Sequence, residues 1–257
     1  MHAIWTGSLS FGLVNIPIRL YSAVQERALS FHLFHKKDKS PIRYVKICEK
    51  EQKEVDLEEI IKGFEVTKGK FVYLEEEDFE KANIYKTNTM EITGFTELSQ
   101  IDPLFFDKPY FLSPDKKSEK AFFLLTDALK TTEKVAIVRY VLKSHENLAI
   151  IRPLKNILIV QQLRYLDEMR SIEGIKGTNI KRSPKELNIA VKLIEELAVD
   201  FDPRNYKDSY VEDLKELIQK KAKGKKIRAK GKRLQKTKMS ELEKKLKDSL
   251  KLKKKSA

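Results

Sequence analysis

The sequence predicts an α+β fold that is mainly β, followed by a helical segment and a basic tail. Three observations indicate this. Apolar and polar residues alternate over much of residues 1–165, as is typical of strands. After about residue 180 the apolar residues recur at helical spacing. The 257 residues are 41% hydrophobic, with 13 Phe and 9 Tyr, which is enough apolar material for one sizeable core.

The first predicted strand region changes phase in its middle. Apolar residues alternate in one phase over residues 9–13 and in the opposite phase over residues 16–20. The change falls at Asn15, just before Pro17. This pattern predicts a bulge or tight bend in a long edge strand.

Later segments predict a hairpin and a three-stranded meander. Residues 64–73 alternate around Gly69, which favours a hairpin with a glycine turn. Residues 135–142, 147–151 and 157–163 are rich in β-forming residues and are separated by short polar links, so we expect an antiparallel meander. Because their middle stretches are apolar on both faces, these strands are expected to be central.

Several helices are predicted. Residues 118–130 carry an apolar stripe made of Ala121, Leu124, Leu125, Ala128 and Leu129. Residues 75–82 suggest a short acidic helix. Ser183 and Ser209 are each followed three residues later by a glutamate, a capping-box pattern that predicts a helix start at each serine. A last candidate helix starts at Ser240 and would be marginal alone.

The positive charge is concentrated at the C-terminal end. The whole chain carries +14, whereas residues 220–257 hold 18 Lys/Arg and three acids, a net +15 that leaves the rest at −1. A polycation of this density attracts polyphosphate by counterion release without reading base sequence. A solubilising or disordered tail is the alternative. Residues 224–238 are of low complexity and are expected to be unstructured.

The composition also indicates a compartment. No run of 18 apolar residues exists, so no membrane-spanning helix is predicted. The N-terminal residues lack the basic-then-apolar order of a secretory signal. One cysteine, Cys48, excludes an internal disulfide. We therefore expect a cytoplasmic protein in a reducing compartment.

The sequence offers no recognisable active site. It contains no glycine-rich phosphate loop, no HExxH, no CxxC pair and no Gly-x-Ser-x-Gly elbow. His32 and His35 are the one close histidine pair, and no second cluster completes a metal site. The acidic residues 75–78 are more typical of a solvated helix than of a metal-dependent nuclease. We expect no enzyme activity, cofactor or metal, although a lyase acting through a lysine amine is left open.

A basic stretch, residues 35–46, is more informative. It mixes cations with an aromatic residue and with strand-forming residues. A strand with Arg43 and Val45 on one face and Tyr44 and Lys46 on the other could present a row of cations to a phosphate backbone. A solvated hairpin is the alternative interpretation.

Several segments resemble the bacterial Ku family. Residues 4–21, IWTGSLSFGLVNIPIRLY, are similar to the opening strand motif of that family. Further similar segments are residues 35–38 with 42–44, 61–65, 101–103, 106–112, 163–165 and 201–203 with Tyr206. Together they cover residues 3 to about 220, nearly the whole chain before the tail.

The resemblance implies a fold and a function. It implies a Ku-type β-barrel core over residues 1–180, with an arm of about residues 25–75 that bridges over DNA. A helical C-terminal arm (181–222) and a Lys-rich tail (223–257) would follow. A homodimeric ring would thread onto double-stranded DNA ends in the bacterial nucleoid and recruit an ATP-dependent DNA ligase of the ligase D type for non-homologous end joining. One departure is Glu51, where many relatives have a second cysteine.

Motif positions and charge together predict the DNA-facing residues. In the bridging arm these are Lys36, Lys37, Arg43 and Lys46. In the tail they are Lys225, Lys226, Arg228, Lys230, Lys232 and Arg233. The ligase-binding surface is expected near residues 205–222. The alternative function is a general nucleoid-type DNA binder driven by the basic tail.

Overall fold

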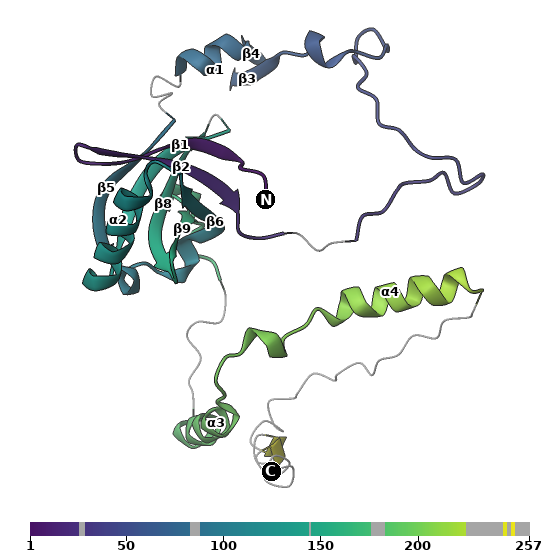
Figure 1. Cartoon of the computed structure of the whole chain (residues 1–257). Helices are drawn as coiled ribbons and strands as arrows, with labels where there is room; N and C mark the ends of the chain where they lie inside the picture. Colours follow the sequence, from purple (N-terminus) through teal and green to yellow (C-terminus); the bar gives the residue numbers. More distant parts are fainter. Residues whose placement is uncertain are drawn as a thin grey trace. The chain divides into compact units, whose positions relative to one another are not determined.

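The computed structural model describes residues 1–25, 29–82, 88–143, 145–175, 183–224, 244–245 and 248–249. The chain divides into two compact units, residues 1–171 and residues 172–257. Figure 1 shows the first unit as a β-barrel with a long excursion, and the second as separate helices.

The first unit is built on a closed barrel of seven strands in the order β1-β2-β6-β9-β8-β7-β5. These strands are β1 (Trp5–Phe11), β2 (Val14–Ser22), β5 (Thr89–Glu97), β6 (Phe106–Pro114), β7 (Lys134–Leu142), β8 (His145–Leu154) and β9 (Ile157–Leu163). The barrel confirms the predicted mainly β, α+β fold. Because β7, β8 and β9 pair in sequence and each has a neighbour on both sides, the predicted central meander is also confirmed.

The barrel closes where β1 runs parallel to β5. Leu9 pairs with Met90, and both side chains are fully buried. The Ser8 N–H donates to the Asn88 carbonyl at 2.8 Å. A Cβ at Gly7 would overlap that carbonyl and the Trp5 ring. Closure therefore requires a residue without a side chain at position 7.

The predicted long edge strand with a bulge at Asn15 is wrong. Residues 5–22 form two antiparallel strands, β1 and β2, and Phe11 pairs with Val14 across a two-residue turn. Gly12 adopts φ 57°, the left-handed conformation that such a turn favours. Since β1 also pairs with β5 and β2 also pairs with β6, neither is an edge strand.

The barrel interior is the core of the first unit. Fully buried side chains from the strands fill it, including Ile18, Met90, Leu112 and Val160. Helix α2 (Glu119–Thr132) adds Phe122, which is fully buried in the same cluster. Fully burying a side chain of this size stabilises a fold by about 2–3 kcal/mol, so the barrel is the main source of stability.

The predicted stripe of α2 is partly confirmed. Leu125 and Leu129 are buried and Ala121 packs against the core, and Phe122 and Thr126 are buried beside them. Leu124 is 71% exposed and lines a groove of about 440 Å³ together with residues of β1, β2 and β5. The prediction included Leu124 and missed Phe122 because apolar residues continue past the buried face.

The chain between β2 and β5 forms a separate excursion. Its strands β3 (Lys62–Thr67) and β4 (Lys70–Leu74) pair with each other. Gly69 adopts φ 79° at their turn, which confirms the predicted hairpin. Helix α1 (Glu76–Ala82) confirms the predicted acidic helix. The short 3-10 helices are η1 (Leu57–Glu59), η2 (Leu98–Gln100), η3 (Pro103–Phe105), η4 (Leu166–Glu168) and η5 (Pro203–Asn205).

The second unit contains α3 (Pro184–Leu197) and α4 (Ser209–Ala222). Ser183 occupies the cap position of α3 but its side chain makes no capping hydrogen bond. The prediction of Ser209 as a cap is wrong, because Asp208 caps α4 by accepting a hydrogen bond from the Val211 N–H at 3.1 Å. Of the candidate helix from Ser240, residues 244–245 and 248–249 are helical and the rest lies outside the described residues.

We expect Gly7→Ala to lower the free energy of unfolding by about 2 kcal/mol or more, because its methyl group forces β1 away from β5. Gly94→Ala is the matched control in the same barrel, since a Cβ there meets nothing within 4 Å. Urea unfolding measures both variants. Equal stability of the two would contradict the close approach at Gly7.

Candidate nucleic-acid interface

The candidate interface lies on the excursion between β2 and β5, whose described part, residues 29–82, is called the arm from here on. Its charges are unevenly distributed. Residues 29–46 carry five lysines or arginines and one acid, whereas residues 47–75 carry five such cations and eight acids. The larger excess of positive charge therefore lies in the first part of the arm, where the four arm candidates lie, and a smaller one lies on the β3–β4 hairpin, with three lysines and one acid.

Two small loops with the same backbone pattern organise this part of the arm. In the first loop, residues 35–40, the His35 N–H donates to the Ser40 carbonyl at 2.8 Å and the Lys39 N–H donates to the His35 carbonyl at 2.9 Å. The second loop, residues 48–53, repeats both bonds with the same spacing. Each loop has one residue with positive φ, Lys39 at 62° and its counterpart Gln52 at 57°.

The predicted strand that would present a row of cations is wrong. The pairing around the two loops reaches only to isolated bridges, at Phe34–Pro41 and Ile47–Glu54. Residues 42–46 lie between these bridges and belong to no strand. Each loop folds back on its own flanks, which leaves the linking residues without a neighbouring strand.

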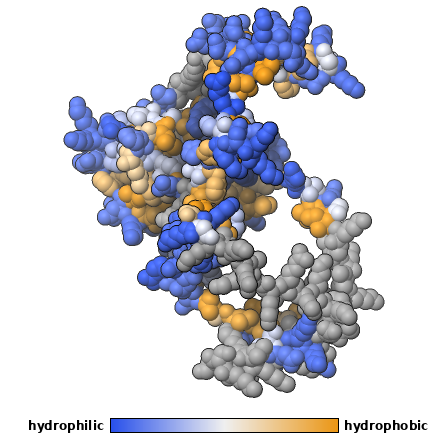
Figure 2. All heavy atoms as spheres, turned by 90° about the vertical axis from the view of Figure 1, so that its right-hand side faces the viewer, coloured by the Kyte–Doolittle hydropathy of each residue, from blue (hydrophilic) through white to orange (hydrophobic). Residues whose placement is uncertain are grey.

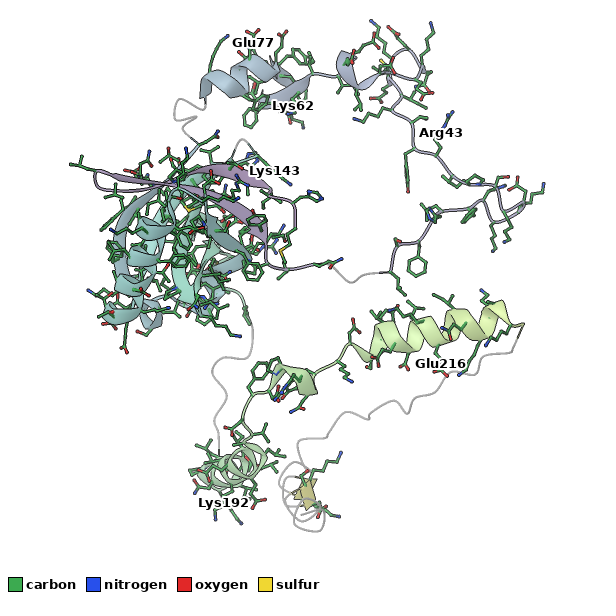
Figure 3. All side chains as sticks on the ribbon, in the orientation of Figure 1. Arg43, Lys62, Glu77, Lys143, Lys192 and Glu216 are labelled. Carbon is green, nitrogen blue, oxygen red and sulfur yellow. The ribbon has the colours of Figure 1, made fainter. Side chains whose placement is uncertain are left out.

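The four predicted arm residues are nevertheless exposed along one continuous stretch. Lys36 and Lys37 lie on the first loop, Arg43 lies on the link, and Lys46 begins the flank of the second loop. Figure 3 shows the Arg43 side chain projecting from the arm. Among the described residues, no ion pair involves these four side chains, so their charges are available to phosphate.

The first loop also contains an acid with a clear structural role. The Asp38 carboxylate accepts a hydrogen bond from the Ser40 backbone N–H, and the His35 ring contacts the same oxygen at 2.8 Å. The Ser40 hydrogen bond, followed by the His35 one, holds the pKa of Asp38 below its usual value. This carboxylate therefore remains charged at neutral pH.

The six predicted tail residues cannot be placed in this way. Lys225, Lys226, Arg228, Lys230, Lys232 and Arg233 lie outside the described residues. The described cation closest to them in sequence is Lys223, at the end of α4. Their role in DNA binding stays a prediction.

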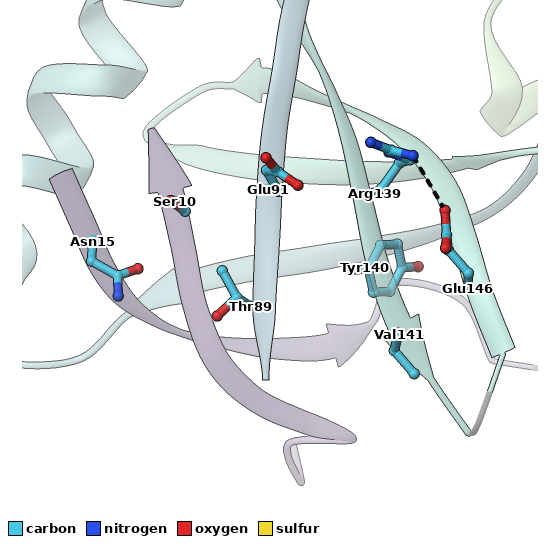
Figure 4. Close-up of a pocket in the computed structure, with 8 residues that line it drawn as sticks. All are labelled: Ser10, Asn15, Thr89, Glu91, Arg139, Tyr140, Val141 and Glu146. Carbon is cyan, nitrogen blue, oxygen red and sulfur yellow. Dashed lines mark ion pairs between the residues drawn. The ribbon is translucent and has the colours of Figure 1, made fainter. Parts of the chain in front are cut away.

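A polar cavity of about 590 Å³ lies on the barrel (Figure 4). Its lining residues are Ser10, Asn15, Thr89, Glu91, Arg139, Tyr140, Val141 and Glu146. Arg139 and Glu146 form an ion pair at 3.8 Å. Burial, with a smaller contribution from Tyr110, raises the pKa of Tyr140, so this phenol keeps its proton at neutral pH. The lining shows no nucleophile paired with a base.

Two other features are absent from the part of the chain that the structure describes. Within it, no group of three or more His, Cys, Asp or Glu side chains is arranged to hold a metal ion. No described helix is long and apolar enough to cross a membrane.

The arm also carries an apolar surface that the sequence analysis did not single out. Fifteen large apolar side chains are between 41% and 83% exposed: Phe31, Leu33, Phe34, Ile42, Tyr44, Val45, Ile47, Leu57, Ile60, Ile61, Phe64, Val66, Phe71, Val72 and Tyr73. Figure 2 shows apolar side chains on the surface of the β3–β4 part of the arm. The sequence of the predicted hairpin could have indicated this surface, because it places apolar residues on both faces of the two strands.

Comparison with known proteins identifies the family. A family model described as the Ku70/Ku80 beta-barrel domain matches residues 10–189, which include most of the barrel and the whole arm. The "Non-homologous end joining protein Ku" of Bacillus subtilis (strain 168) is 38% identical over 228 residues, 88% of this chain and 73% of that protein. The protein of the same name from Archaeoglobus fulgidus is 38% identical over 229 residues, 88% of this chain and 90% of its own length.

A third relative, from Symbiobacterium thermophilum, is 39% identical over 226 residues, which is 87% of this chain and 56% of that protein. The fold defines the class of protein: a closed β-barrel with an exposed arm. The described cavity on the barrel shows no catalytic arrangement of side chains. The chain belongs to the Ku β-barrel family, as its motifs predicted.

We expect replacement of Arg43 and Lys46 by alanine to weaken binding to duplex DNA and to reduce the magnitude of the slope of log K against log salt by about 1.8 for each bound copy, because each lost phosphate contact removes about 0.9. A salt titration by fluorescence anisotropy measures this slope. Lys120→Ala with Lys130→Ala, on α2, removes the same charge outside the arm and should leave the slope unchanged. Equal slopes for both double variants would contradict an arm interface.

Proposed function

We propose that two copies of this chain form a ring that binds double-stranded DNA ends without reading base sequence. In this proposal the ring recruits an ATP-dependent DNA ligase, of the ligase D type, for double-strand break repair by non-homologous end joining. The single observation that carries the proposal is the arm, which combines an apolar surface without cover and a short cationic stretch.

The apolar surface supports the dimer. Monomeric proteins rarely expose large apolar surfaces, because such surfaces favour association, and fifteen large apolar side chains of the arm are exposed. The barrel of the same copy is closed and its interior is filled, so it has no free sheet edge for the arm to join. A second copy of the chain is the simplest partner, since a closed two-fold dimer buries the apolar surfaces of both arms at once.

The charge distribution supports end binding by shape. Residues 1–219 carry a net charge of −1, so the barrel and arm are not a general polycation. Contacts from a few cations on the arm would position a duplex without carrying sequence information. The names of the relatives, which refer to non-homologous end joining, agree with this assignment.

The ligase contact is assigned to the second unit. Helix α4 has no buried residues, and Tyr210, Leu217 and Ile218 are between 37% and 72% exposed. An amphipathic helix with an open apolar face is a common docking element for a partner protein. We therefore assign the ligase-binding surface to residues 205–222.

The alternative is a nucleoid-type protein in which the basic tail does the binding. The +15 charge of residues 220–257 favours it. The two functions differ in topology, because a tail can bind any duplex whereas a ring needs a free end.

We expect the protein in solution to have a mass of about 60 kDa, twice that of the 30.0 kDa chain. Phe64→Ser with Tyr73→Ser should shift it toward the monomer, because both side chains are two-thirds exposed on the arm. Sedimentation equilibrium gives the mass directly. Leu124→Ser, on the α2 groove, is the control for general loss of apolar surface. A wild-type mass of 30 kDa would rule out the ring.

A competition assay separates the ring from the tail-driven binder. We expect the wild-type protein to bind a linear duplex and to be displaced poorly by a closed circle of the same sequence and length. Neutralising Lys225, Lys226, Arg228, Lys230, Lys232 and Arg233 to glutamine should weaken binding and its salt dependence yet keep the preference for linear DNA. Equal competition by line and circle, or complete loss of binding in the neutralised variant, would favour the alternative.

A further inference from the structure

Asp38 is the residue on which the side-chain order of the first loop depends. Its Oδ1 accepts a hydrogen bond from the Ser40 backbone N–H at 3.0 Å and lies 2.8 Å from His35 Nδ1. An ionised carboxylate has no proton to donate, so His35 Nδ1–H is the donor. Lys36 and Lys37 lie between these two anchored residues. Asp38 therefore closes the loop across the two lysines.

The second loop shows what this carboxylate adds. Both loops have the same two backbone hydrogen bonds, with Cys48 in the place of His35 and Lys53 in the place of Ser40. Glu51 occupies the position of Asp38. In the described part of the chain, the hydrogen bond across the second loop comes from the Gln52 amide to the Glu49 carbonyl at 2.7 Å, and none involves the Glu51 carboxylate. The backbone thus forms this turn without the acid, while the side-chain clamp belongs to Asp38.

The three lysines of the first loop differ in their contacts. The Lys39 ammonium donates to the Lys36 carbonyl at 2.8 Å, so it is tied back onto the loop. Lys36 and Lys37 are exposed, and among the described residues no ion pair holds them. A loop that is already ordered loses less conformational entropy when its lysines meet phosphate.

We propose that Asp38 is a positioning residue for DNA: through His35 and Ser40 it holds the loop that presents Lys36 and Lys37 to the phosphate backbone. This rests on the proposed function, which places the arm on the duplex. Charge alone predicts the opposite effect of Asp38 on DNA affinity. A carboxylate beside two lysines weakens their attraction to phosphate, so simple electrostatics requires that its removal strengthen binding. Positioning requires that its removal weaken binding.

The test compares four variants of the full chain on a linear duplex by fluorescence anisotropy at several salt concentrations. Asp38→Ala should bind about tenfold more weakly, comparable to the loss of one charge-assisted hydrogen bond. Asp38→Asn keeps an oxygen acceptor for both donors and should bind within about twofold of the wild type or more tightly. Glu51→Ala makes the same charge change on the second loop, and its DNA affinity should also stay within about twofold of the wild type.

The fourth variant, Lys36→Ala with Lys37→Ala, should reduce the magnitude of the salt slope by about 1.8 for each bound copy, and Asp38→Ala should change it in the same direction. Sedimentation equilibrium on each variant must give the wild-type mass. Four results would overturn the proposal. Both Asp38 variants could bind more tightly than the wild type, or both could be weakened equally. The Lys36/Lys37 variant could bind DNA as the wild type does, or Asp38→Ala could change the mass of the assembly. If the wild-type protein bound circular DNA as well as linear DNA, the proposed ring would be contradicted. The order of the variants in affinity would still test the role of Asp38 in the first loop.

Discussion

The parallel pairing of β1 with β5 is the constraint on which the rest of the structure depends. It closes the barrel, and it is possible because Gly7 lets the two backbones approach. In the barrel, β2 and β5 lie on opposite sides of β1, so the chain from β2 to β5 cannot be a tight turn between neighbouring strands. The arm forms this connection. A closed barrel with a filled interior also leaves no free sheet edge for the arm.

The arm combines two chemically different kinds of surface. Residues 29–46 carry the larger excess of positive charge, and exposed apolar side chains lie both there and on the hairpin of β3 and β4. The cations suit a polyanion as partner and the apolar side chains suit a protein. The proposed ring would use both, and the basic tail would then adjust affinity and salt dependence. The arm and barrel would determine the selectivity for DNA ends, and the tail would determine how strongly the protein is attracted to DNA.

The sequence predicted local features well and distant ones poorly. The hairpin at Gly69 and the meander of residues 135–163 were predicted correctly because alternation and turn residues are local signals. Barrel closure was not predictable from periodicity, since a parallel pair of distant segments leaves no local pattern; the family resemblance supplied it. The first loop was missed for another reason. It depends on a side-chain acceptor, Asp38, and on a left-handed residue, Lys39, that is not glycine. Of the candidate site, the arm cations could be placed and the tail cations could not.

Topological trapping shows whether the protein encircles DNA, as proposed. The protein is loaded on a linear duplex, the ends are ligated to form a circle, and the salt concentration is then raised to a level that strips it from linear DNA. A closed ring cannot leave a circle without opening, so we expect the protein to remain bound to the circular DNA. Release from the circle at the same salt concentration as from the line would contradict it, because electrostatic contacts alone respond to salt regardless of topology.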